Sequence, residues 1–185
     1  MTIQNIHDLF LKCSKVSIDT RKIETNSFFV AIKGERFDAN TFAKEALEKG
    51  ASFVVIDNAN YYIDERTILV NDSLETLQEL AKFHRQFLNL PIIVLTGSNG
   101  KTTTKELINV VLSKKFDTKA TVGNLNNHIG VPLTLLSFTK DYKFYPIYTV
   151  IYYENLNDAE NNQNIINTYK FNFYNIYKNT SCQTI

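Results

Sequence analysis

The residues best suited to chemistry lie in the segment Thr96-Gly-Ser-Asn-Gly-Lys-Thr-Thr103. Gly97 and Gly100 carry no Cβ, so the backbone N–H groups of this loop can converge on an anion. Lys101 supplies a mobile positive charge for the β- and γ-phosphates of a nucleotide, and the hydroxyl of Thr102 is suited to bind Mg²⁺. The pattern therefore predicts a nucleotide site with Lys101 and Thr102 as its catalytic residues. The predicted contacts to the phosphates come from Gly97, Ser98, Asn99, Gly100, Lys101, Thr102 and Thr103.

A strand and a helix are expected on either side of this loop. The run Ile92–Leu95 is typical of a parallel strand buried on both faces. After the loop, apolar residues recur at helical spacing: Leu107, Ile108, Val111 and Leu112. The general phosphate-loop pattern has a further glycine at the position of Leu95, so the match is incomplete. An ordinary capped turn with an exposed lysine is the alternative, but strand, glycines, lysine and helix all agree with a phosphate-binding loop.

Residues 1–90 alternate strand and helix patterns, which indicates an α/β fold. Strands are expected at residues 16–21, 28–32, 52–56 and 67–70, and helices at 3–13, 40–49 and 73–89. The expected N-caps are Thr2, Asn40 and Asp72, and Gly50 is expected just past the end of the second helix. Pro91 marks a boundary because the residue before a proline avoids helical geometry. We therefore expect a small amino-terminal α/β domain at 1–90, the first part of a P-loop-type parallel-sheet domain at 91–144, and a divergent tail at 145–185.

The bulk properties exclude several classes of partner. The chain has 185 residues, 44% of them hydrophobic and 21% charged, which suits a globular protein with a real core. A formal net charge of +1 and the lack of a basic run argue against nucleic acid or an anionic membrane as partner. Cys13 and Cys182 match no metal or redox spacing and are expected to be reduced thiols. With no signal-peptide pattern and no long apolar run, a cytoplasmic monomer is expected.

Two segments together resemble the Mur ligase family. They are the loop at residues 96–103 and the downstream sequence Gly123-Asn-Leu-Asn-Asn-His-Ile-Gly-Val-Pro132. From spacing alone, Asn126 and Asn127 read as a turn whose amides bond to their own backbone. The resemblance instead implies that both asparagines are polar contacts near the reacting groups. It also implies ATP and Mg²⁺ as cofactors, and the branch of the family whose substrates are UDP-N-acetylmuramoyl-tripeptide and D-alanyl-D-alanine.

A second resemblance concerns the amino-terminal region. On local reading, Asp19 and Arg21 form only an exposed ion pair or an Asx-turn. However, Ser17-Ile-Asp-Thr-Arg21 followed by Phe28 to Asp38 resembles the Mur ligase domain that holds the UDP end of the substrate. The resemblance implies substrate contacts from Thr20, Arg21, Phe37 and Asp38. The family usually continues Asp-Gly-His, whereas this chain has Asp38-Ala-Asn40, so contacts through that glycine and histidine are not carried over.

From Tyr145 onward the composition shifts to tyrosine and asparagine, and the resemblance ends. The family places a Mg²⁺-binding glutamate near the position of Tyr148, and its later lysine, histidine and carboxy-terminal domain have no counterpart here. The expectation is therefore a truncated ligase with an out-of-frame or degenerate ending and impaired activity. Two alternatives stay open. One is a non-catalytic fragment that binds UDP-muramoyl substrate, and the other is an unrelated P-loop nucleotide hydrolase.

Overall fold

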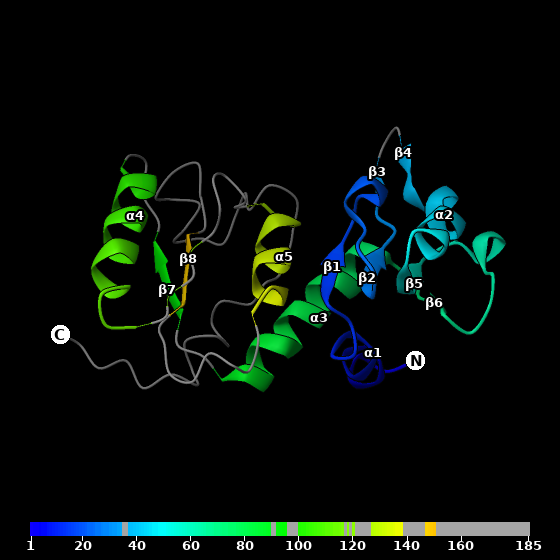
Figure 1. Cartoon of the computed structure of the whole chain (residues 1–185), viewed down its shortest axis with the longest axis horizontal. Helices are drawn as coiled ribbons and strands as arrows, with labels where there is room; N and C mark the ends of the chain where they lie inside the picture. Colours follow the sequence, from blue (N-terminus) through cyan, green and yellow to red (C-terminus); the bar gives the residue numbers. More distant parts are fainter. Residues whose placement is uncertain are drawn as a thin grey trace. The chain divides into compact units, whose positions relative to one another are not determined.

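The computed structural model of the chain describes residues 1–34, 37–89, 92–95, 100–116, 118, 120, 127–138 and 147–150. The chain forms two compact units (Figure 1). The first contains Met1–Asn89 together with Pro132–Asp141, and the second contains Leu90–Val131 together with Tyr142–Ile185. Of the helices in the described ranges, none is both long enough and apolar enough to span a bilayer.

The first unit is built on a four-stranded parallel sheet with the strand order β1-β2-β5-β6. Its strands are β1 (Lys15–Ser17), β2 (Ser27–Val30), β5 (Ala51–Ile56) and β6 (Thr67–Leu69). Its helices are α1 (Ile3–Phe10), α2 (Ala43–Glu48) and α3 (Ser73–Leu88). Between them lie the small antiparallel pair β3 (Lys33–Gly34) and β4 (Phe37–Asp38) and the 3₁₀ turns η1 (Thr20–Lys22), η2 (Ala39–Phe42) and η3 (Ala59–Tyr61). The predicted alternation of strands and helices is confirmed.

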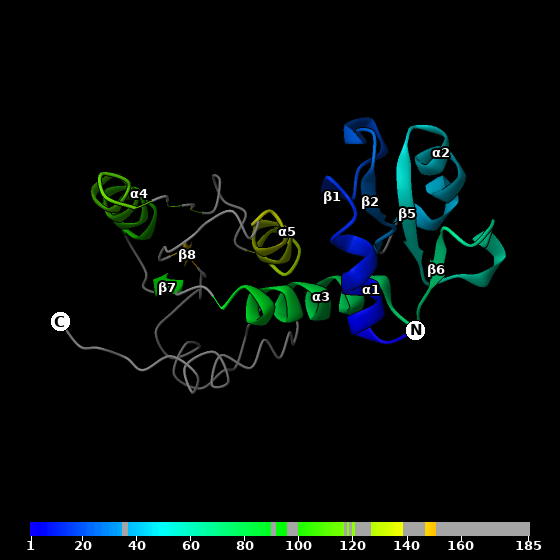
Figure 2. The same cartoon turned by 60° about the horizontal axis from the view of Figure 1, so that its bottom comes forward.

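Helices cover both faces of this sheet (Figure 2). Successive strand residues point to opposite faces, and β2 is buried along its whole length because both faces are covered. Phe29 belongs to the core cluster that the sheet forms with α2. On the other face, Phe28 meets Phe10 of α1, with ring centroids 6.1 Å apart. The sheet is therefore the central layer of a three-layer α/β unit.

The predicted helix signals hold at three of four positions. Thr2 caps α1 and forms a capping box with Asn5. Asp72 caps α3, where its Oδ1 accepts from the N–H of Glu75 at 2.7 Å. Gly50 follows α2 with φ +107°, as a residue past a helix end often does. The prediction for Asn40 is wrong. Asp38 caps the 3₁₀ turn η2 that precedes α2, so Asn40 lies inside that turn, fully buried, with its side chain on other partners.

We expect Gly50→Ala to destabilise the first unit by about 1–2 kcal/mol. A left-handed φ strains any L side chain, and an added Cβ would meet the Cα of Thr25 at 3.3 Å. Gly34→Ala is the control, because its Cβ would find only the carbonyl oxygen of Phe37, at 3.8 Å. Urea denaturation followed by circular dichroism measures both variants. Equal losses of stability would contradict the assigned role of Gly50.

Two histidines are buried between α1 and α3. His7 Nε2 lies 3.0 Å from His84 Nδ1, and His84 Nε2 lies 2.9 Å from the carbonyl oxygen of Phe138. A carbonyl only accepts, so His84 Nε2 carries the hydrogen, and His7 Nε2–H donates to His84 Nδ1. Burial lowers the pKa of His84, and the hydrogen bond to Phe138 opposes this only partly. His84 is therefore a packed residue of the first unit, with 1% of its surface exposed.

The second unit has a parallel strand pair, β7 (Ile92–Leu95) with β8 (Ile147–Val150). Helix α4 (Lys101–Leu112) follows β7, as the pattern around the loop predicted, and Gly100 is its N-cap residue. Helix α5 (Gly130–Leu136) starts at the end of the Leu90–Val131 stretch, and its residues from Pro132 onward belong to the first unit. The loop residues Gly97, Ser98 and Asn99 lie outside the described residues.

Candidate functional site

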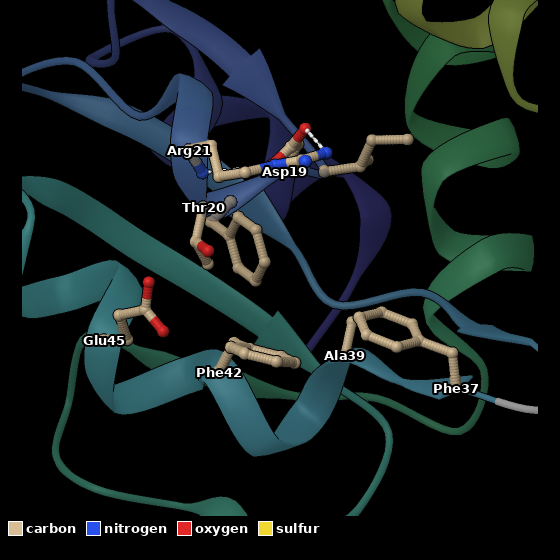
Figure 3. Close-up of a pocket in the computed structure, with 9 residues that line it drawn as sticks. Asp19, Thr20, Arg21, Phe37, Ala39, Phe42 and Glu45 are labelled. Atoms are coloured by element: carbon tan, nitrogen blue, oxygen red, sulfur yellow. Dashed lines mark hydrogen bonds and ion pairs between the residues drawn. The ribbon is translucent and has the colours of Figure 1, made fainter.

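An open pocket of about 640 Å³ lies in the first unit, beyond the carboxyl ends of β1 and β2 (Figure 3). Ligands of open parallel sheets bind at this edge, because loops there can converge without blocking the strands. Four segments contribute its walls: the residues that follow β1, strand β2, the residues around η2, and the first turn of α2. The lining residues are Ile18, Asp19, Thr20, Arg21, Phe29, Phe37, Ala39, Phe42 and Glu45.

Arg21 reaches the pocket in a fixed position beside Asp19 (Figure 3). Asp19 Oδ1 accepts from the backbone N–H of Arg21 at 3.0 Å and from its Nε at 2.9 Å, and Oδ2 accepts from Nη2 at 2.8 Å. These hydrogen bonds from Arg21 hold the pKa of Asp19 at about 2. The Asx-turn and the ion pair of the local reading are both present. The guanidinium nevertheless stays open to solvent, with 85% of the side chain exposed.

Glu45 faces Thr20 across the pocket (Figure 3). Hydrogen bonds from Lys49 and then from Thr20 lower the pKa of Glu45, and Lys49 Nζ lies 2.6 Å from Glu45 Oε1. The pocket therefore contains one cationic group and two carboxylates, each engaged with a neighbour. Sequence reasoning did not identify Glu45 or Phe42 as site residues. Their three-residue spacing at the start of α2, which puts both on one helix face, was the available signal.

An aromatic pair forms the lower wall of the pocket in this view (Figure 3). The rings of Phe37 and Phe42 are stacked, with centroids 5.5 Å apart and an interplanar angle of 22°. Phe37 is 57% exposed, so one face of its ring is available to a planar ligand. Asp38 does not line the pocket. Its Oδ1 accepts from Asn40 N at 2.9 Å and from Asn40 Nδ2 at 2.6 Å, and Ala39 takes the lining position beside it.

The predicted nucleotide site is described only in part. Gly100 has φ +76° and stands at the N-terminus of α4, whose first turn carries the exposed Thr102 and Thr103. A helix start leaves backbone N–H groups for an anion. Asn127 Oδ1 accepts from the N–H groups of Ile129 at 3.2 Å and Gly130 at 2.7 Å, which is the turn that spacing alone favoured. Its predicted neighbour Asn126 lies outside the described residues.

Cys13 adds no chemistry to either region. It is a free cysteine at the end of the first helical segment, and burial raises the pKa of its thiol to about 11. A thiol with such a pKa is protonated at neutral pH and is a poor nucleophile. Within the described ranges, no three His, Cys, Asp or Glu side chains gather in a way that could hold a metal ion.

Comparison with known proteins decides the family. UDP-N-acetylmuramoyl-tripeptide–D-alanyl-D-alanine ligase of Bacillus subtilis (strain 168) is 45% identical to the chain over 128 residues, which is 68% of this chain. A family model described as the Mur ligase family catalytic domain matches residues 12–85, and one described as the Mur ligase middle domain matches residues 95–147. The chain belongs to the Mur ligase family. This Mur ligase chain spans 28% of the length of its Bacillus relative.

Solved structures agree with this Mur ligase assignment. A crystal structure of MurF from Acinetobacter baumannii matches with a TM-score of 0.69 and 31% identity, over 82% of this chain and 36% of that one. The MurF ligase of Thermotoga maritima in complex with ADP matches with a TM-score of 0.67 and 32% identity, over 77% of this chain and 33% of that one. The expected α/β fold with a parallel sheet is thus confirmed for the Mur ligase chain.

Proposed function

We propose that this chain carries the UDP-substrate-binding domain and the first part of the ATPase domain of a ligase that adds D-alanyl-D-alanine to UDP-N-acetylmuramoyl-tripeptide. The observation that carries the proposal is the pocket. It gathers Thr20, Arg21 and Phe37 from separate segments of a chain that is 45% identical to an enzyme of that name. The proposed domains are 1–90, 91–144 and 145–185, and the proposed working form is a cytoplasmic monomer.

The pocket suits the UDP end of the substrate. The guanidinium of Arg21 can make charge-assisted hydrogen bonds to a diphosphate. The exposed face of Phe37, backed by Phe42, offers a surface on which a base can stack. The hydroxyl of Thr20 faces Glu45 and can accept from a ligand N–H or O–H group.

ATP and Mg²⁺ are proposed at the start of α4. The left-handed Gly100 and the exposed Thr102 and Thr103 fit a phosphate at the helix N-terminus. Lys101 would offset charge on the phosphates, and Thr102 would hold Mg²⁺ with its hydroxyl, the other ligands being phosphate oxygens and water. Bound ATP would supply the phosphoryl group that activates the tripeptide carboxylate for attack by the amine of D-alanyl-D-alanine. The loop and the helix start would position those phosphates.

A second candidate is a chain that only captures the UDP-linked substrate. It is favoured by the location of the pocket, whose lining residues all fall between positions 18 and 45 of the first unit. Substrate capture would then require no residue of the nucleotide loop. The two candidates differ in one measurable respect, which is whether the chain also binds ATP.

We expect Arg21→Ala to weaken UDP binding roughly tenfold, because it removes a charge-assisted bond to the diphosphate. Isothermal titration calorimetry of the 185-residue chain with UDP measures the effect. If the unsubstituted chain does not bind UDP, the pocket has been assigned the wrong ligand.

Lys101→Ala is the complementary control for Arg21→Ala. Under the ligase proposal, Lys101→Ala weakens ATP binding and leaves UDP binding unchanged, while Arg21→Ala does the reverse. A chain that binds UDP but shows no ATP binding, even before substitution, would favour the capture-only candidate. ATP binding without UDP binding would instead point to a nucleotide hydrolase.

A further inference from the structure

Asp19 occupies only part of the hydrogen-bonding capacity of Arg21. A guanidinium carries five N–H donors. The Asp19 carboxylate takes the Nε donor and one donor of Nη2, at 2.9 Å and 2.8 Å. Three donors therefore remain, one on Nη2 and two on Nη1. In Figure 3 the guanidinium lies beside Asp19, and both residues line the pocket. The ion pair thus fixes the plane of the guanidinium and leaves three of its N–H donors for a ligand.

Asp19 is itself held firmly. Its side chain is only 25% exposed, against 85% for Arg21. Its backbone N–H and carbonyl both bond to the hydroxyl of Ser17 at the end of β1, at 3.3 Å and 2.9 Å. One carboxylate oxygen also accepts from the backbone N–H of Arg21. A long, exposed arginine would otherwise sample many rotamers, and fixing it in advance lowers the entropy cost of binding.

The chain contains an internal comparison for this arrangement. Asp64 and Arg66 have the same Asp-x-Arg spacing and the same contacts: Asp64 Oδ1 accepts from the backbone N–H of Arg66 at 2.9 Å, and Nε and Nη2 of Arg66 reach the carboxylate at 3.1 Å and 2.5 Å. Neither residue lines the pocket. The Asp-x-Arg contacts therefore recur away from the pocket described above, and it is Arg21, not Arg66, that lines this pocket.

We propose that Asp19 is a positioning residue for UDP-linked ligands, which holds the guanidinium of Arg21 so that its three remaining donors meet the diphosphate. The inference rests on the proposed function of the pocket. The competing account makes Asp19 a rival anion that must release Arg21 before a phosphate can bind. The two accounts predict opposite signs for the loss of the carboxylate charge, so a single substitution separates them.

The test is Asp19→Asn in the 185-residue chain, with UDP titrated by calorimetry and uridine by NMR. Asparagine keeps the oxygen that accepts from the backbone of Arg21, and loses the second acceptor and the charge. We expect UDP binding roughly 3- to 10-fold weaker and uridine binding unchanged, because uridine has no phosphate. Asp64→Asn, the matched control, leaves both affinities unchanged. Measurement in about 0.5 M salt suppresses the Coulomb repulsion between Asp19 and the phosphates.

A double variant shows whether Asp19 acts through Arg21. In the Arg21→Ala background, Asp19→Asn should cause no further loss of UDP affinity, as coupled residues do in a double-mutant cycle. Tighter UDP binding by Asp19→Asn overturns the positioning role and supports the rival-anion account. An equal loss for UDP and uridine also overturns it, since that pattern reports a disturbed fold. If UDP binding is weakened by Arg21→Ala but not by Asp19→Asn, the positioning role of Asp19 fails and the proposed function of the pocket stands. If the unsubstituted chain does not bind UDP, both fail.

Discussion

Asn40→Asp is expected to destabilise the first unit by about 3–5 kcal/mol at pH 7. Asn40 is fully buried and uses its whole side chain. Its Nδ2 donates to Asp38 Oδ1 at 2.6 Å and to Asp57 Oδ1 at 2.7 Å, while its Oδ1 accepts from the backbone N–H of Asp57 at 3.0 Å. The substitution keeps the shape of the side chain. It replaces the NH₂ group, which donates to Asp38 and Asp57, by an oxygen that can only accept when ionised. Three carboxyl groups would then converge where one amide now joins two.

Hydrogen exchange of peptides from β2 and β5 during urea denaturation measures this loss in the first unit. Asn58→Asp is the matched control, since Asn58 uses only its side-chain oxygen, which accepts from Asn60 N at 3.1 Å. That change should be nearly neutral. The defect of Asn40→Asp should shrink toward pH 5, where a proton restores a donor to the cluster. A loss below about 1 kcal/mol, or one equal to the control, would show that Asn40 does not join these segments.

Stability of the first unit should also fall as the pH drops from 7 to 5, because His84 is buried beside His7. The folded-state pKa of His84 lies below its ordinary value of 6.5. Well above pH 6.5, His84 is neutral in both the folded and the unfolded state, so it adds no pH dependence to the free energy of unfolding. Below pH 6.5, His84 takes up a proton in the unfolded state but stays neutral in the folded state. The free energy of unfolding then falls by up to about 1.4 kcal/mol per pH unit, until the folded-state pKa is reached.

His84→Gln tests this pH dependence. Glutamine can still donate to the carbonyl oxygen of Phe138 but cannot take up a proton, so the decline between pH 7 and pH 5 should become shallower. Urea denaturation at several pH values measures it. The carboxylates with lowered pKa, Asp19, Asp64 and Glu45, lose their contributions mainly below about pH 5, so they do not interfere between pH 7 and pH 5. An unchanged slope in His84→Gln would assign the acid sensitivity to other groups.

The sequence alone predicted those features that depend on residues close to one another in the chain. Thr2, Asp72 and Gly50 act within four residues of themselves, so spacing alone located them. The Asn40 cluster and the histidine pair depend on partners far away: Asn40 and Asp57 are 17 residues apart, and His7 and His84 are 77 apart. No local pattern encodes such contacts. Asn40 looked like a helix cap because asparagine is common at caps, and only the fold shows its side chain turned inward.

The pocket residues likewise fall into those that the sequence predicted and those that it did not. Thr20, Arg21 and Phe37 were predicted because their segments resemble a known substrate-binding domain, and the structure gathers them around one pocket. Glu45 and Phe42 were missed because helix periodicity assigned that segment to packing. Asp38 was predicted as a substrate contact, but its carboxylate bonds to Asn40. The resemblance pointed to segments that line one pocket, and side-chain direction within them required coordinates.

The first unit is assembled from two separate stretches of sequence, since Pro132–Asp141 belongs with Met1–Asn89. A fragment that stopped at Asn89 would lack Phe138, and His84 would lose the carbonyl that accepts its Nε2–H. No single cut in the chain frees an intact copy of this unit. Protein engineers who wish to isolate the proposed UDP pocket would need to splice the returning segment onto the end of α3, or keep the chain at least as far as Asp141.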